Sequence, residues 1–433
     1  DGDRIDRDTA WTAKLAALEL LWSERAVPPG TVPAVDELEP ALRDFATWCA
    51  LCELLGNDWR QWPESLRRPD SSSVTTARCE LAERVRFHAW LQQLCDEGLA
   101  AGQRAAIDAG MDVGVVHDLA VGADPGGADA WVLQDALALG ARIGAPPDTF
   151  NQQGQDWGLP PWHPRALAQL GYAPLRDMVR GLLRHAGGVR IDHILGMFRL
   201  WWIPSGASAR DGSYVSYDAD ALLGVIALEV ERAGAIVVGE DLGTVPPHVR
   251  TVLADRGLLG SSVLWFEREE ADEGETGVLS RPDQWREAAM ASVTTHDLPT
   301  ALGWLRGEHV RVRAELGLLD DPAAEQKSWA EQRRELLEHL VAAGVLSGLD
   351  ASEEEQVHAL HAFLAATPSR YVLAAPGDAV GDLSQPNLPG TVDQYPNWRL
   401  PVCDTSGRPL LLDELLADPR VARLADQLAD AIR

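Results

Sequence analysis

From about residue 110 onward, short apolar segments alternate with longer helical segments, and this alternation constrains the fold more than any other feature. The predicted strands cover residues 111–122, 187–196, 233–243, 261–269, 291–300 and 370–380. The predicted helices cover residues 163–186, 218–233, 246–256 and 282–290, and a longer helical insertion covers about 305–366. Such alternation predicts a parallel sheet, because parallel neighbouring strands need a crossover connection that is usually a helix.

Carboxylates stand at the ends of five of these predicted strands. They are Asp118, Asp192, Glu240, Glu267 and Asp297. A (β/α)8 barrel builds its active site at the carboxyl ends of its strands, around a ring, whereas an open sheet binds ligands at one switch point. Carboxylates on several successive strands favour the ring. We therefore predict an α/β fold of the TIM-barrel type.

The number of predicted strands is smaller than such a barrel needs. Six strands are recognisable where eight are expected, and residues 8–105 read as helices, with apolar residues three and four positions apart. The segment PESLRRPDSSSVTT within this region is predicted to be a polar loop. Either two strands are absent from the chain, or the helical interpretation of its first hundred residues hides them.

The charge balance limits the class of partner. The 66 acidic and 38 basic residues give a formal net charge of −28. This surface repels nucleic acid and anionic membranes, so a neutral small molecule or a neutral polymer is the expected partner. No run of residues reaches the roughly 18–20 apolar positions of a membrane span.

Cysteine usage and the charged first residues predict a cytoplasmic location. Five cysteines are an odd and sparse set for a chain of 433 residues, which is typical of a reducing compartment. Cys49 and Cys52 form a C-x-x-C pair on an apolar helix face, and no second pair completes a zinc site, so we expect buried thiols. The sequence begins DGDRIDRDTAW, which is too charged for a signal peptide.

Two of the strand-end carboxylates have neighbours that suit complementary roles in breaking a glycosidic bond. That chemistry needs one carboxyl group that protonates the leaving oxygen and another that attacks the anomeric carbon or activates water. Arg190 lies two residues before Asp192, on the same side of the strand, and its positive charge keeps a nucleophilic carboxylate ionised. Glu240 adjoins Asp241, and nearby negative charge or apolar cover holds an acid's proton more tightly.

Each of these residues also has a structural explanation. A single aspartate at a strand end is commonly a helix cap or a surface charge, and His296 with Asp297 could cap the following helix. His193 could be a satisfied polar residue at the rim of the sheet, although both imidazoles could also donate hydrogen bonds to sugar hydroxyls. The combination R-x-D-H, G-E-D and T-H-D, in this order on successive strands, favours catalysis over these explanations.

Several longer segments resemble one enzyme family. RIDHILGMFRLWWIP, IVVGEDLGTVP and SVTTHDLPTALGWLRG resemble the signature strands of the 4-α-glucanotransferases called amylomaltases or disproportionating enzymes, in glycoside hydrolase family seventy-seven. They resemble the α-amylase clan more loosely. PPDTFNQQGQDWGLPPW, at residues 146–162, is similar to the family's active-site loop, and QPNLPGTVDQYPNWRLP, at residues 385–401, is similar to its C-terminal signature. The resemblance spans about residues 105–401.

The resemblance implies a role for each matching position. Asp192 matches the nucleophile, Glu240 the general acid/base, and Asp297 the third carboxylate, which binds hydroxyls of the donor sugar. The residues that match the surroundings of the donor sugar are Arg190, His193 and His296. The remaining matches are Trp157, which guides acceptor glucans, Asp118 on the third barrel strand, and Asn387 and Asn397 near the donor site.

The implied activity is transfer of an α-1,4-glucan segment from a donor to an acceptor glucan, with retention of configuration through a covalent glycosyl-enzyme. Maltooligosaccharides and α-1,4-glucans are the expected partners, without a cofactor or a metal ion. Two alternatives remain: an α-glucan hydrolase of the α-amylase clan, and an incomplete glucan-binding chain without activity.

The chain departs from the family pattern at its beginning. Family members start with a first barrel strand and a Ser-Pro-Tyr-type loop, whereas DGDRIDRDTAWTAKLAALELLW resembles the helical region that follows the second strand. The resemblance therefore implies a barrel whose first two strands this chain lacks. We expect residues 1–105 to form a mainly helical inserted subdomain and residues 106–433 to carry barrel strands three to eight. A separate N-terminal portion of the same protein is then a further expected partner.

Overall fold

The computed structural model describes residues 4–24, 28, 30–147, 153–243, 245–269 and 277–432. By its internal contacts the chain divides into two compact units. The first unit is Lys14–Leu259, and the second combines Asp1–Ala13 with Gly260–Arg433. Each unit has its own hydrophobic core and its own set of parallel strands, so each is described by itself.

Helices make up the early part of the first unit. They are α1 (Arg7–Ser23), whose first turns belong to the second unit, α2 (Pro40–Leu55), α3 (Ser72–Glu80) and α4 (Ala82–Asp108). Phe87 and Trp90 of α4 are buried against the partly buried Trp22 of α1. The predicted polar loop is shorter than expected, because the Ser71 hydroxyl accepts a hydrogen bond from the Val74 N–H at 3.1 Å and starts α3 there.

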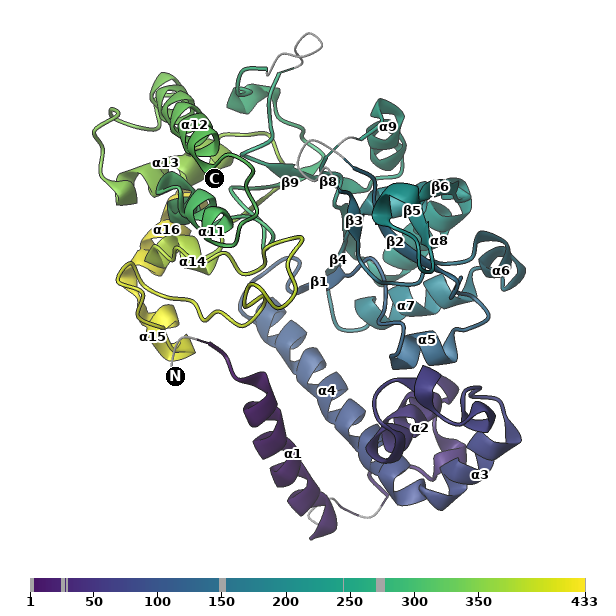
Figure 1. Ribbon diagram of the computed structural model, residues 1–433. Coiled ribbons are helices and arrows are strands. Elements are labelled where there is room, and N and C mark those ends of the chain that lie inside the picture. Colours follow the sequence, from purple (N-terminus) through teal and green to yellow (C-terminus); the bar gives the residue numbers. More distant parts are fainter. Residues whose placement is uncertain are drawn as a thin grey trace. The chain divides into compact units, whose positions relative to one another are not determined.

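Three parallel strands of the first unit match three of the predicted strands. Strands β1 (Val116–Leu119), β4 (Gly188–Ile191) and β7 (Ile236–Gly239) pair in the order β1-β4-β7. The helices between these strands include α6 (Pro164–Gln169), α7 (Ala173–Leu183) and α8 (Ala219–Ala233), and α9 (Pro247–Asp255) follows β7 (Figure 1). Buried aliphatic residues of these strands and helices form one core cluster, which includes Val179, Val189, Ile191, Leu223, Ile226 and Val237. The predicted helices over 218–233 and 246–256 are confirmed, whereas the predicted helix over 163–186 is broken into α6 and α7.

A four-stranded antiparallel sheet in the first unit was not predicted. It consists of β2 (Ala141–Ala145), β3 (Gln155–Asp156), β5 (Arg199–Pro204) and β6 (Ser213–Ser216), in the order β3-β2-β5-β6. These strands are short, and β5, with the sequence RLWWIP, lacks the strict alternation that marks a strand with one solvated face. The pairing of β2 with β5 joins segments roughly sixty residues apart, which local patterns do not reveal.

The second unit carries the other three predicted strands. Strands β8 (Leu259–Val263), β9 (Ala289–Ser292) and β10 (Tyr371–Leu373) pair in parallel in the order β8-β9-β10. The predicted helix over 282–290 is wrong: a short 3-10 turn, Pro282–Gln284, precedes β9. The alanines of this segment favour a helix locally, but all four residues of β9 are buried, and tertiary packing overrides propensity.

Glu267 and Asp297 do not end their strands as predicted. Strand β8 ends at Val263 and β9 at Ser292, so both carboxylates lie in the loops that follow. Both strands are shorter than the apolar runs that predicted them, because the chain turns soon after leaving the ladder. At Phe266, for example, the N–H donates to the Val263 carbonyl at 2.9 Å.

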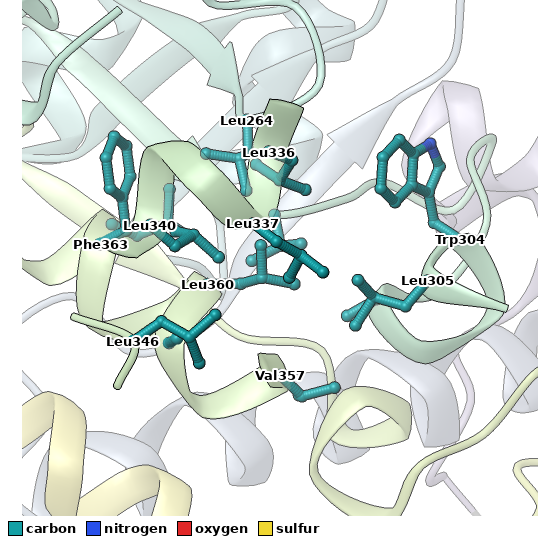
Figure 2. Packing of buried hydrophobic residues seen from close by; sticks show 14 of the residues in the cluster. Leu264, Trp304, Leu305, Leu336, Leu337, Leu340, Leu346, Val357, Leu360 and Phe363 are labelled. Carbon is teal, nitrogen blue, oxygen red and sulfur yellow. The ribbon is translucent and has the colours of Figure 1, made fainter. Parts of the chain in front are cut away.

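Helices build the core of the second unit around these strands. They are α10 (Ala301–Leu305), α11 (Glu308–Glu315), α12 (Pro322–Ala342), α13 (Glu353–Ala365), α14 (Pro376–Val380), α15 (Leu412–Ala417) and α16 (Pro419–Ile432). Figure 2 shows side chains of α12 meeting those of α13, including Leu337 and Leu360, with Trp304 and Leu305 of α10 beside them. This core fixes α10, which follows the loop that carries Asp297.

The thiols of Cys49 and Cys52 are partly buried, and burial raises the pKa of both to about 12, as expected for protonated structural thiols. Among the described residues, no group of three or more His, Cys, Asp or Glu side chains is arranged to hold a metal ion. No described helix is both long and apolar enough to span a bilayer.

Candidate active site

Asp192 is the first residue after β4, and Arg190 connects it to Asp118 on the neighbouring strand. In the parallel register of β1 and β4, Asp118 lies directly opposite Arg190. The Arg190 Nη1 atom is 2.8 Å from Asp118 Oδ1 and 3.1 Å from Asp192 Oδ1. One guanidinium nitrogen therefore bridges two carboxylates, which favours the ionised form of Asp192.

The charge of Arg190 is itself maintained by this arrangement. Burial lowers the pKa of the guanidinium, but the negative charges of Asp118, Asp192 and Glu240 more than offset it, so that the pKa is raised overall. The predicted proximity of Arg190 and Asp192 is thus confirmed. Asp118, by contrast, lies within β1 and not after it.

Glu240 is the first residue after β7, and its carboxyl group is held by two backbone amides. Its Oε2 accepts a hydrogen bond from the His193 N–H at 3.0 Å, and its Oε1 accepts one from the Leu242 N–H at 2.8 Å. Burial is the largest influence on its pKa and raises it, and the charge of Asp192 raises it further. The two amides and Arg190 lower it, but the net direction is upward. Glu240 is therefore suited to carry a proton.

The charge of Asp241 was predicted to raise the pKa of Glu240, but other groups account for the upward shift. Asp241 is buried, and its Oδ2 lies 3.4 Å from the Arg250 Nε, so its charge is partnered there. Burial of Glu240 and the charge of Asp192 supply the upward shift of the pKa instead. Apolar cover, which was the other sequence-based explanation, is thus the main one.

His193 joins the two carboxylates through its backbone. It has φ +46° and ψ 60°, a left-handed conformation that a non-glycine residue adopts only at a cost. This conformation turns its N–H toward Glu240 directly after Asp192. The next residue, Ile194, donates its N–H to the Glu240 carbonyl at 3.0 Å. Burial lowers the pKa of the His193 imidazole to about 4, so the ring is neutral near pH 7.

Trp157 lies against His193, as the motif match implies for residues of one site. The two ring centroids are 5.4 Å apart in an edge-to-face arrangement. The Trp157 indole N–H donates to the Gln155 side-chain oxygen at 3.2 Å, which orients the ring. Residues 148–152 of the predicted active-site loop lie outside the described residues.

In the second unit, Asp297 is the centre of a separate polar cluster. Its Oδ1 accepts a hydrogen bond from the Asn387 amide at 2.6 Å, and its Oδ2 is 3.2 Å from His296 Nε2. The Asn387 N–H donates to the His296 carbonyl at 3.0 Å, and the Gln385 amide donates to the Asp297 carbonyl at 2.9 Å. The structure thus brings together His296, Asp297 and Asn387, which were all predicted, and adds Gln385.

Asp297 does not cap the helix that follows it. The N-cap of α10 is Thr300, whose hydroxyl accepts a hydrogen bond from the Gly303 N–H at 3.2 Å. The Ala301 N–H, another free amide of this helix end, donates to Asp378 Oδ1 at 2.8 Å. Thr300 and Asp378 therefore bind the first amides of α10, and the capping explanation for Asp297 is wrong.

Asn397 has its amide group engaged within the loop that carries it. Its Oδ1 accepts a hydrogen bond from the Leu388 N–H at 2.8 Å, and its Nδ2 donates to Thr391 Oγ1 at 2.9 Å. It therefore ties residues 388–397 together. Trp398 belongs to the predicted C-terminal signature but was not predicted to be a site residue. Its ring centroid lies 5.0 Å from that of His296. A tryptophan directly after a matched motif position, Asn397, was the signal that the sequence offered.

The cluster in the first unit combines two carboxyl groups, Asp192 and Glu240, whose electrostatic environments have opposite effects on ionisation. Asp192 Oδ1 lies 3.1 Å from the Arg190 guanidinium, which favours its anion, whereas burial raises the pKa of Glu240 above its ordinary value. A pair of carboxyl groups with such different environments is suited to supply a nucleophile or base and an acid within one site. The cluster in the second unit offers carboxylate, amide and imidazole groups, which are suited to hydrogen bonding with hydroxyls.

Comparison with known proteins agrees with this chemistry. The sequence model of glycoside hydrolase family 77, described as 4-alpha-glucanotransferase, matches residues 1–405. The chain is 51% identical to the 4-alpha-glucanotransferase of Mycobacterium tuberculosis, over 99% of this chain and 60% of that protein. It is 34% identical to the 4-alpha-glucanotransferase of Haemophilus influenzae, over 76% of this chain and 47% of that protein.

Solved structures with a similar fold come from the same group of enzymes. The amylomaltase of Corynebacterium glutamicum has a TM-score of 0.84 and 41% identity, covering 100% of this chain and 60% of that one. The amylomaltase of Streptococcus agalactiae in complex with acarbose has a TM-score of 0.76 at 19% identity, covering 100% of this chain and 81% of that one, which shows likeness of fold alone.

The chain spans about 60% of the length of the mycobacterial relatives it matches. The matched range, residues 1–405, includes both polar clusters. The chain belongs to glycoside hydrolase family 77, the 4-alpha-glucanotransferase family.

Proposed function

We propose that the protein carrying this sequence is a 4-α-glucanotransferase, which moves a segment of an α-1,4-glucan from a donor to an acceptor glucan. The observation that carries the proposal is the opposite electrostatic setting of Asp192 and Glu240 on neighbouring strands, β4 and β7. Membership of the family supports the same assignment. The substrates are maltooligosaccharides and longer α-1,4-glucans, and no cofactor takes part.

The proposed first step is formation of a glycosyl-enzyme. A carboxylate oxygen of Asp192 attacks the anomeric carbon, and the bond from that carbon to the glycosidic oxygen breaks. The proton of Glu240 passes to that oxygen, so the leaving glucan departs with a free 4-hydroxyl. Arg190, which bridges Asp118 and Asp192, keeps the nucleophile ionised before the attack.

The proposed second step returns the enzyme to its starting state. Glu240, now a carboxylate, takes the proton from the 4-hydroxyl of an acceptor glucan, and that oxygen attacks the anomeric carbon. The ester to Asp192 breaks, and two inversions together retain the α configuration. Transfer exceeds hydrolysis when an acceptor glucan excludes water, and Trp157, packed against His193, is the proposed aromatic guide for it.

Asp297, His296 and Asn387 are proposed to bind hydroxyl groups of a donor sugar. The carboxylate of Asp297 is oriented by Asn387 and His296, which limits its freedom and prepares it for hydrogen bonding. Asn397, whose amide holds its own loop, is proposed to act by shaping that loop. Removing charge from Asp297 then weakens binding of the reacting sugar more strongly in the transition state than in the ground state.

The parallel strands are proposed to be strands three to eight of a (β/α)8 barrel. The supporting observations are the two sets of three parallel strands, in sequence order, and the share of the relatives' length that the chain spans. In this proposal residues 1–105 are a helical subdomain inserted in the barrel, residues 106–433 supply those six strands with a helical insertion at about 305–366, and an N-terminal portion completes the ring. A cytoplasmic location is proposed from the cysteine usage.

Incubation with maltotriose tests the proposed activity. Transfer is expected to produce a ladder of longer maltooligosaccharides together with glucose, visible by chromatography. A hydrolase of the α-amylase clan would release reducing sugar without the ladder. A glucan-binding protein without activity would leave maltotriose unchanged, and substitution of Asp192 by Asn would then alter nothing.

Retention makes a separate geometric prediction. In a crystal structure with a bound glucan, the carboxyl groups of Asp192 and Glu240 are expected about 5–5.5 Å apart, which leaves no room for a water molecule between nucleophile and anomeric carbon. A separation near 8 Å, as in inverting enzymes, would contradict the double displacement.

Replacing Arg190 with Met is expected to lower both activity and stability. The variant leaves Asp118 and Asp192 without their shared cation, so the free energy of unfolding should fall by about 1–3 kcal/mol, reduced from the fully buried case because Asp118 is partly exposed. Chemical denaturation and initial transfer rates measure the two effects.

The matched control for this substitution is Arg78 to Met. Arg78 is similarly buried in the same unit and lies 2.8 Å from Asp44, away from the strand ends. It should lose comparable stability while keeping the transfer rate of the folded protein. Equal losses of activity in both variants would show that Arg190 serves the fold alone.

A further inference from the structure

Trp398 combines an exposed ring with an uncommon backbone conformation. Its φ is +61°, in the left-handed region, where a large non-glycine residue is strained. The residue is 48% exposed, so burial of the indole does not compensate for this strain. Strained residues of this kind cluster at binding sites, where the surrounding structure holds them in place.

The backbone of Trp398 is held from both sides. Its N–H donates to the Pro386 carbonyl at 2.9 Å. Its carbonyl accepts a hydrogen bond from Arg7 Nε at 3.1 Å and a second one from Arg7 Nη2. The adjacent Arg399 carbonyl accepts the Ile5 N–H at 2.6 Å. A short N-terminal segment thus fixes a loop almost four hundred residues away in the sequence.

The Trp398 side chain lies beside the polar cluster of the second unit that is centred on Asp297. The rings of Trp398 and His296 are 5.0 Å apart at an interplanar angle of 48°. His296 contacts Asp297 at 3.2 Å, and Asn387 donates to the same carboxylate. An indole face and a set of hydroxyl-binding groups are therefore adjacent, which is the pairing that a sugar ring requires, because its C–H faces are apolar and its edges polar.

We propose that Trp398 is a sugar-contacting residue of the donor side and that Arg7 is a positioning residue that acts through its carbonyl. The proposal rests on the proposed glucanotransferase function and adds an aromatic contact and its support to it. The occupant is a glucose unit of an α-1,4-glucan, stacked on the exposed indole while its hydroxyls reach the Asp297 cluster. The hydrogen bonds to the Trp398 backbone from Arg7 and to the Pro386 carbonyl keep the ring in place before the glucan arrives, which lowers the entropy lost on binding.

Variants of Trp398 test the contact in the protein carrying this sequence. Trp398→Ala is expected to raise the KM for maltotriose roughly 5- to 10-fold with a smaller change in kcat, whereas Trp398→Phe keeps most of the affinity because it keeps an aromatic face. Trp11→Ala is the matched control, since Trp11 is 53% exposed in the same unit. It should leave the KM unchanged.

Trp398→Gly distinguishes an effect on stability from an effect on the sugar contact. Glycine adopts positive φ freely, so this variant should melt at a higher temperature than Trp398→Ala and yet show the same raised KM. If both variants keep the wild-type KM, or if Trp11→Ala raises it equally, the sugar contact is overturned. If the wild-type protein neither converts nor binds maltotriose, the proposed function fails first, which is a different outcome.

Arg7 is tested by a conservative pair of variants. Arg7→Ala should raise the KM in the same direction as Trp398→Ala, and the double variant should add little, because both changes act through one ring. Arg7→Lys should restore part of the affinity, since an ammonium can still donate to the Trp398 carbonyl. Arg4→Ala, an exposed arginine three residues earlier, is the control. Additive effects in the double variant, or no rescue by lysine, would contradict the positioning role.

Discussion

Replacing Asp192 with Asn is expected to lower the turnover of maltotriose by roughly 10⁴-fold or more, because the amide cannot form the glycosyl-enzyme. The side chain keeps its size and can still accept a hydrogen bond from Arg190, which lies 3.1 Å from Asp192 Oδ1. Stability should therefore change far less than activity. Product chromatography measures the first quantity and thermal unfolding the second.

The control for this variant is Asp96 to Asn. Asp96 is a partly exposed carboxylate in the same unit, paired with Arg184 Nη1 at 2.8 Å, and it is remote in sequence from the strand ends. It should retain wild-type turnover. A folded Asp192→Asn protein that still disproportionates maltotriose would remove Asp192 from the nucleophile role and with it the proposed mechanism.

Replacing Glu240 with Gln is expected to lower transfer from maltotriose by roughly 10²- to 10⁴-fold, the usual contribution of general acid–base catalysis. The leaving glucan then departs without a proton. A donor with a good leaving group that needs no proton, such as an α-maltosyl fluoride, should still form the glycosyl-enzyme with Asp192. The rate loss should therefore be much larger for maltotriose than for the fluoride, and equal losses would argue against an acid role.

The pH dependence follows from the same group. The first step needs the protonated form of Glu240, and burial together with Asp192 raises its pKa above the usual range of a glutamic acid. The proton is thus retained to higher pH than in an exposed glutamate, and kcat/KM should fall as the pH rises through the raised pKa. For the fluoride donor, which needs no proton from Glu240, this alkaline decline should be absent in the wild-type protein.

Much of the parallel framework follows from local patterns. Each of the six predicted strands contains or overlaps a parallel strand, because buried parallel strands are short apolar runs bounded by polar residues. The failures lie where local preference and packing disagree. The helix predicted over residues 282–290 is wrong: residues 289 and 290 instead begin β9, all four residues of which are buried in the sheet. The antiparallel sheet of β2, β3, β5 and β6 depends on distant partners and was missed.

The candidate site was likewise predictable from the sequence in part only. The alternation of side chains along a strand places Arg190 and Asp192 on one side, and the sequence alone predicted their contact. The sequence also indicated that His296, Asp297 and Asn387 belong to functional motifs. It did not show that Asn387 donates to Asp297, because the two lie ninety positions apart and meet only through packing of the second unit.

The sequence by itself determined which residues can carry the chemistry: strand-end carboxylates, with a guanidinium two positions before one of them. The tertiary structure decided the electrostatic environment and the hydrogen-bond partners of these carboxylates. Burial, and not the adjacent Asp241, raises the pKa of Glu240, and the left-handed backbone of His193 aims an amide at that carboxyl group. The physical reason is that side-chain identity and strand periodicity are local, whereas solvent exclusion and the direction of a backbone amide depend on every segment packed around the site.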